Sequence, residues 1–76
     1  MTAQDFKNAL NRLDLNDYNE AGFIFRVSWQ TIYKWANGKK PVPAMVGRLV
    51  QIIELTGILD ILMDEYRLIQ EVEVVR

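Results

Sequence analysis

Residues 17–38 read DYNEAGFIFRVSWQTIYKWANG and carry the signals of two short helices in close succession. Asp17 is a good N-cap for the first helix, which is expected to run for about eight residues through Phe25. Ser28 is a good N-cap for the second helix, and Gly38 stops it. Only two residues stand between Phe25 and Ser28, so the link must be a tight turn.

The second helix of this pair has a core face and a polar, aromatic face. Ile32, Trp35 and Ala36 recur at helical spacing and are expected in the core, where a tryptophan in such a pattern is usually found. The remaining side chains are too polar and too aromatic for a helix that only packs, which indicates a role at the surface. They are Trp29, Gln30, Tyr33, Lys34 and Asn37. Trp29 and Tyr33 also fit a second interpretation, in which they plug a pocket against the C-terminal helix or another protein.

One helix is predicted before this pair and two after it. Thr2 begins a capping box and a helix over about 3–13. Residues 39–43 form a stiff loop, and Pro43 fits the first turn of a helix that Gly57 ends. This helix is expected to be the most buried, because apolar residues surround much of it: Met45, Val46, Leu49, Val50, Ile52 and Ile53. A last helix is expected after Gly57. The predicted fold class is therefore all-α, a compact bundle of four to five helices.

The composition excludes several classes of function. Seventy-six residues, half of them apolar, are enough for one compact domain. The chain has no cysteine and no histidine, so thiolate chemistry, the commonest general base and the commonest zinc ligand are missing. We therefore expect no enzyme activity, no metal and no cofactor. No stretch reaches the roughly 18 apolar residues of a membrane span, and residues 1–12 lack a signal pattern, which favours a cytoplasmic protein.

The charges are unevenly distributed, although the net charge is only −1. Residues 1–20 sum to −2 and residues 54–76 to −4. Between them the chain contains no acid and carries five cations: Arg26, Lys34, Lys39, Lys40 and Arg48. A local basic patch attracts a polyanion whatever the net charge of the chain, so nucleic acid remains a candidate partner.

Two short helices joined by a tight turn have the geometry of a helix-turn-helix motif. In that motif the second helix lies in the major groove of DNA and the first helix crosses above it. Ala21 and Gly22 supply the small residues that are needed where the two helices touch. Apolar residues stand where the corner has to be filled: Phe25, Val27, Ile32 and Trp35.

Residues 27–41, VSWQTIYKWANGKKP, resemble the lambda-repressor/Cro-type (XRE-like) family of phage and bacterial helix-turn-helix regulators. The likeness covers about residues 3–56 and includes the Val-Ser step into the helix, the late buried aromatic residue, and the glycine, basic residues and proline that follow. The chain departs from the family at Arg26, where glycine is common, so the turn is expected to need an unusual backbone angle there. It also has Tyr18 where the family commonly has a phosphate-binding glutamine.

The resemblance implies roles for the exposed residues of the second helix. Gln30 suits the edge of adenine, Lys34 suits guanine or a phosphate, and the two aromatic rings suit thymine methyl groups or the sugar-phosphate backbone. Base contacts are therefore expected from Trp29, Gln30, Tyr33, Lys34 and Asn37. Phosphate contacts are expected from Tyr18, Arg26, Ser28, Lys39 and Lys40. The two loop lysines also fit a loop that is only solvated.

Residues 1–57 are expected to form the DNA-binding domain, and residues 58–76 an amphipathic tail helix. The apolar stripe of the tail either folds back onto the core or pairs with the same stripe in a second copy. Its candidate dimerisation residues are Ile58, Leu62, Tyr66 and Ile69. Asp60 and Asp64 lie one helical turn apart, and a solvated helix face explains them better than a metal site, because the sequence offers no further ligands beside them.

Together these observations predict a sequence-specific regulator of transcription that binds double-stranded DNA. The simplest form is a repressor that occupies an inverted-repeat operator as a homodimer. The alternative is an adaptor or antitoxin-like module, which keeps the same fold and uses Trp29, Tyr33 and the tail to bind a partner protein. Neither interpretation involves a membrane or a small-molecule substrate.

Overall fold

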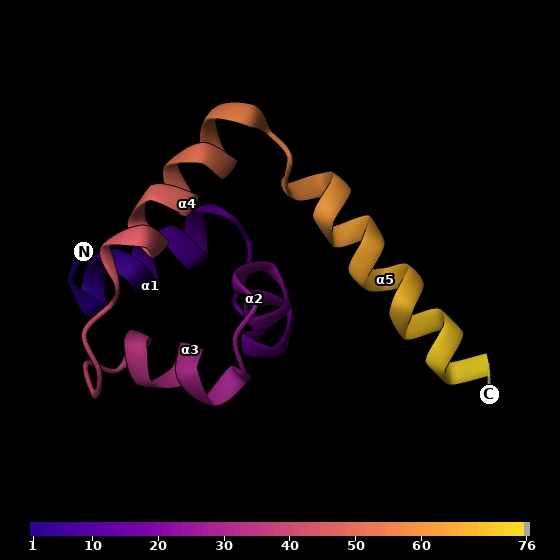
Figure 1. Ribbon diagram of the computed structural model, residues 1–76, viewed down its shortest axis with the longest axis horizontal. Helices are drawn as coiled ribbons and strands as arrows, with labels where there is room; N and C mark the ends of the chain where they lie inside the picture. Colours follow the sequence, from indigo (N-terminus) through magenta and orange to yellow (C-terminus); the bar gives the residue numbers. More distant parts are fainter. Residues whose placement is uncertain (76) are drawn as a thin grey trace.

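A computed structural model describes residues 1–75, and the side chains through residue 70, as five helices with no strand among them (Figure 1). The helices are α1 (Ala3–Arg12), α2 (Tyr18–Phe25), α3 (Trp29–Ala36), α4 (Ala44–Thr56) and α5 (Leu59–Val75). The all-α prediction is confirmed, and every predicted helix is present within one or two residues of its expected ends. The last residue of the predicted tail, 76, lies outside the described residues.

Side-chain caps set the first three helix starts. The hydroxyl of Thr2 accepts a hydrogen bond from the backbone N–H of Asp5 at 3.0 Å, and the carboxylate of Asp5 accepts one from the backbone N–H of Thr2 at 3.2 Å. The backbone N–H of Thr2, followed by its side chain, lowers the pKa of Asp5, because hydrogen bonds to the carboxylate favour its charged form. The carboxylate of Asp17 caps α2 by accepting from the N–H of Asn19 at 2.9 Å. The capping box predicted at Thr2 is therefore confirmed.

The core is built where the inner faces of α1, α2 and α3 meet. Phe6 is fully buried, and its ring centroid lies 6.0 Å from that of Phe25 and 5.7 Å from that of Trp35. The Phe6–Trp35 pair is nearly perpendicular, at 89°, which is a favourable arrangement for two aromatic rings. The prediction that Trp35 belongs to the core is confirmed.

The prediction that α4 would be the most buried helix is wrong. Val46, Val50 and Ile53 do face the core. The other large apolar side chains of this helix are exposed: Met45, Leu49, Ile52 and Leu55. The physical reason is that α4 lies at the edge of the bundle beside α1, and no described segment packs over its outer side (Figure 1).

The first half of α5 packs against α2. Met63 is buried in the common core, and Leu59 packs against it. The ring of Tyr66 lies 5.1 Å from that of Phe23, centroid to centroid, and is tilted by 58°. From there the second half of α5 extends beyond the rest of the bundle (Figure 1), and its Leu68 and Ile69 are exposed. The tail therefore folds back onto the core along its first half.

Candidate nucleic-acid interface

The outward side of α3 gathers four of the five predicted base-contact residues. Trp29, Gln30, Tyr33 and Lys34 together line one shallow depression. Trp29 and Gln30 lie one helical turn before Tyr33 and Lys34, on the same side of the helix. Trp29 is 50% exposed and Tyr33 is 41% exposed, which is unusual for such large rings. We call these four residues the α3 face.

The opposite side of α3 holds this helix rigidly in place. Ile32 is completely buried, and Trp35 and Ala36 are nearly so. The indole of Trp35 is held edge-on against the ring of Phe6, which comes from α1. A close-packed core leaves little room for rotation, so the α3 face points in one fixed direction relative to the bundle.

The fifth predicted base-contact residue, Asn37, has a different environment. It is the C-cap of α3, and its side-chain amide N–H donates to the carbonyl oxygen of Tyr33 at 2.8 Å. The same carbonyl also accepts the backbone N–H of Asn37 at 3.0 Å, so the side-chain amide adds a second hydrogen bond at the end of α3. Asn37 is exposed but does not line the depression of the α3 face. Its local role is therefore to end the helix.

The turn between α2 and α3 depends on two backbone features. Arg26 adopts the left-handed conformation, with φ 60° and ψ 42°, as its place in the sequence predicted. The backbone N–H of Val27 donates to the carbonyl oxygen of Gly22 at 2.9 Å and closes the end of α2. A β-carbon on Gly22 would lie only 2.6 Å from the carbonyl oxygen of Val27. Glycine at position 22 therefore lets the turn lie directly on α2.

The hydroxyl of Ser28 is engaged at the start of α3. It accepts a hydrogen bond from the backbone N–H of Thr31 at 3.3 Å, and it lies 3.2 Å from the hydroxyl of Thr31. The predicted N-cap is confirmed. A shallow cleft between α2 and α3 brings Ser28 beside Arg26 and Trp29. Two of the predicted phosphate ligands thus border the same cleft as one end of the α3 face.

Tyr33 connects the α3 face to the other predicted phosphate ligands. Its ring lies 6.5 Å from that of Tyr18, the first residue of α2, in an edge-on arrangement. On the loop after α3, the ammonium of Lys39 lies 6.0 Å from the centroid of the Tyr33 ring. A cation at this distance from an aromatic face is weakly attracted to it. Tyr18 and Lys39 therefore border the α3 face.

The cations around the α3 face have no acidic partner among the described residues. The ion pairs among the described residues join Arg12 to Glu54 and Arg67 to Asp64, both away from this surface. The exposed cations near the α3 face are Arg26, Lys34, Lys39 and Lys40. Unpaired cations retain their full attraction for an external anion, so this side of the molecule suits a polyanionic partner.

The four predicted dimerisation residues are divided by the fold. Leu62 and Tyr66 are partly buried, and Tyr66 packs against the core. Ile58 and Ile69, at the two ends of the stripe, are exposed. The structure therefore does not present them as one continuous apolar surface.

The part of the chain that the structure describes offers neither a metal site nor a membrane-spanning helix. No group of three or more carboxylates there is placed to hold a metal ion, and Asp60 and Asp64 lie on the exposed side of α5. None of the five described helices is long and apolar enough to cross a membrane.

Comparisons with known proteins identify no relative. No protein-family model, no curated protein sequence and no solved structure matches this chain.

Proposed function

We propose that this protein is a sequence-specific regulator of transcription that reads double-stranded DNA with α3. The observation that carries the proposal is the α3 face, an outward surface of amide, aromatic and cationic groups on a helix that is fixed by its buried side. Unpaired cations surround this face, and the whole segment 21–53 contains no acid.

The shape of the α2–α3 unit supports a helix-turn-helix mode of binding. An α-helix with its side chains is about 10–12 Å across, and the major groove of B-form DNA is about 12 Å wide, so an exposed helix such as α3 fits into it. Within that groove Gln30 reads adenine, Lys34 donates to guanine or a phosphate, and the rings of Trp29 and Tyr33 contact thymine methyl groups or the backbone.

The phosphate contacts come from the residues that border the α3 face. Arg26, Lys39 and Lys40 supply charge, and the hydroxyl of Tyr18 donates from the start of α2. The hydroxyl of Ser28 is held by its cap, so the backbone N–H groups at the start of α3 contribute there instead. These contacts set the register of the protein on DNA, whereas the α3 face supplies the sequence preference.

The proposed mode of action is repression by occupying a promoter. A protein bound at a promoter through this surface blocks polymerase sterically. Two copies on an inverted repeat would place two α3 helices in successive major grooves, one helical turn apart. The place of action that goes with this function is the cytoplasm.

A second candidate function is binding of a partner protein through the α3 face. The observation that favours it is the exposure of Trp29 and Tyr33, because large aromatic residues dominate the energy of many protein interfaces. The two functions differ in their response to salt. DNA binding weakens steeply as the salt concentration rises, because the release of counterions from DNA becomes less favourable, whereas a contact centred on aromatic residues is much less sensitive to salt.

The deciding experiment is selection of duplexes from a random DNA pool at two salt concentrations. Enrichment of an inverted repeat, with affinity that falls as salt rises, is expected. Gln30→Ala should relax the preference at one base pair, and the loop control Lys39→Ala should weaken binding to every sequence and reduce the salt slope by about 1. If Gln30→Ala changes neither affinity nor preference, α3 is not the reading helix. Binding that is absent or blind to sequence would favour the protein partner.

A further inference from the structure

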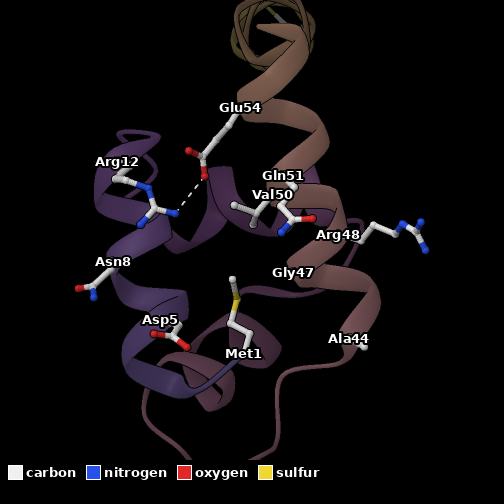
Figure 2. Close-up of a pocket in the computed structure, with 10 residues that line it drawn as sticks. All are labelled: Met1, Asp5, Asn8, Arg12, Ala44, Gly47, Arg48, Val50, Gln51 and Glu54. Carbon is white, nitrogen blue, oxygen red and sulfur yellow. Dashed lines mark hydrogen bonds and ion pairs between the residues drawn. The ribbon is translucent and has the colours of Figure 1, made fainter.

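The helix α4 presents three distinct sides. Its core side packs inward, and a second side borders a polar groove shared with α1. Figure 2 shows this groove, with the carboxylate of Glu54 directed at the guanidinium of Arg12, 3.0 Å away. In the same view Arg48 points away from α1. The third side of α4 therefore faces neither the core nor the groove.

This third side is aliphatic and uncovered. Its exposed fractions are 65% at Met45, 36% at Leu49, 46% at Ile52 and 87% at Leu55. We call these four residues the α4 stripe. They follow one another at intervals of four, three and three residues, which keeps them along one side of a helix. Single exposed apolar residues are ordinary on a protein surface, whereas a continuous stripe along a whole helix marks a contact surface.

We propose that the α4 stripe is the surface through which two copies of this chain associate. A helix stripe of this kind is self-complementary when two copies meet across a two-fold axis. With the helices antiparallel, Leu49 of one copy lies against Ile52 of the other, and Met45 lies near Leu55. Arg48 borders the stripe as its nearest charge, and its aliphatic stem can lie along the contact while its head stays in water.

The area is sufficient for a weak but specific dimer. From their exposed fractions, the four side chains offer roughly 400 Å² of apolar surface per copy, or about 800 Å² for two. Homodimer interfaces are about 65% apolar, so this corresponds to a total of about 1,200 Å². Stable interfaces begin at that size.

The α4 stripe is a better dimer surface than the tail. Tyr66 already packs against Phe23, which removes it from the apolar stripe of α5. Leu62 is also partly buried, which leaves Ile58 and Ile69 exposed only at the two ends of that stripe. The α4 stripe is exposed at all four of its residues, and the charged head of Arg48 beside it can stay in water.

The role of the proposed dimer rests on the proposed function, because the dimer would supply the second α3 that an inverted repeat requires. The contact itself involves no residue of the α3 face. Association of the chains and binding of DNA can therefore fail separately.

The test is the solution mass of the full chain by sedimentation equilibrium from about 1 μM to about 500 μM, a range that covers the affinity of small interfaces. The wild type should rise from 8.9 kDa toward twice that mass. Ile52→Glu and Leu55→Glu should remain monomeric, with association weakened at least about tenfold. The matched controls are Ile61→Glu and Leu68→Glu on α5, which are 68% and 62% exposed and should leave the dimer unchanged.

Circular dichroism of each variant checks that the helices are intact, which is expected because all four positions are exposed. A wild type that stays at 8.9 kDa across the range overturns the proposal, and so does loss of the dimer in the α5 variants but not in the α4 variants. A folded monomeric α4 variant should still bind a single half-site. If the dimer forms but no variant and no wild type binds DNA, the proposed function has failed and the interface stands.

Discussion

Replacing Gly22 by alanine should destabilise the fold, although alanine is the better helix former. The added methyl group would lie 2.6 Å from the carbonyl oxygen of Val27, and ordinary contact begins at 3.4 Å, so about 0.8 Å is missing. The obstacle is a backbone atom, which cannot rotate away as a side chain can. That part of the chain is also tied to α2 by the hydrogen bond from the N–H of Val27 to the carbonyl oxygen of Gly22.

The expected size follows from two opposing effects. Forcing an extra methyl group into a packed site costs about 1–3 kcal/mol. Exchanging glycine for alanine inside a helix returns about 1 kcal/mol. Because the obstacle is a backbone atom, the cost of the methyl group should lie at the upper end of its range, about 2–3 kcal/mol, so the net loss should be about 1–2 kcal/mol. For a domain of this size each kcal/mol lowers the melting temperature by about 4–8 °C. Gly22→Ala should therefore melt roughly 5–15 °C below the wild type.

Gly47→Ala is the matched control, because Gly47 is also inside a helix and has no unusual φ. A β-carbon there would meet only the side chain of Met1, at 3.8 and 3.9 Å, which is ordinary contact. This variant should gain up to about 1 kcal/mol. Thermal melts followed by far-ultraviolet circular dichroism compare the two. If both alanine variants melt above the wild type by similar amounts, the close approach of the turn to α2 is refuted.

Three further changes test other parts of the structure. Arg26→Gly should raise the free energy of unfolding by up to about 1 kcal/mol, since glycine tolerates the left-handed conformation. It should also weaken DNA binding and reduce its salt slope by about 1. A melting temperature below that of the wild type would contradict the predicted gain in stability. Trp35→Ala should cost about 3–5 kcal/mol and unfold the chain, whereas Trp29→Ala should change stability by less than about 0.5 kcal/mol, as circular dichroism will show. Asp5 has a lowered pKa in the folded state, so its charged form stabilises the fold above the unfolded pKa of about 3.9, and this contribution is lost as the pH falls through the folded value. The wild type should therefore melt above Asp5→Asn at pH 7 and lose that advantage as the pH falls through the folded pKa of Asp5, and a difference that persists at lower pH would argue against the capping role.

The parts of the fold that depend on local signals could be predicted from the sequence. Caps and helix ends act within a few residues, so Thr2, Asp17, Ser28 and Gly38 mark helix boundaries without knowledge of the rest of the chain. The unusual backbone angle at Arg26 was expected from the family resemblance, because glycine is common at that place in the family. The four residues of the α3 face could be predicted because helical spacing assigns the opposite side of the helix to the core and leaves these positions at the surface.

The parts that depend on distant contacts were missed. Leu15 is completely buried although it lies in the break after α1, because its neighbours come from other elements of the fold. The contact between Phe23 and Tyr66 joins residues more than forty positions apart and leaves no local pattern. On α4 the sequence contains two apolar stripes, and helical spacing cannot show which of them the small bundle will cover.

The outer sides of the helices can differ in chemistry, because packing of the core fixes only a few positions on each helix. The inner sides of α1 to α4 each bury three residues, so the remaining positions are free to serve another purpose. On α3 those positions combine amide, aromatic and cationic groups, whereas on α5 they include three acids, Asp60, Asp64 and Glu65, which repel DNA and so favour approach through α3. On α4 they are aliphatic, and an aliphatic surface has no favourable interaction with water or with DNA phosphates. A second copy removes that surface from water and leaves the α3 face open, so association and DNA binding use different sides of the same small molecule.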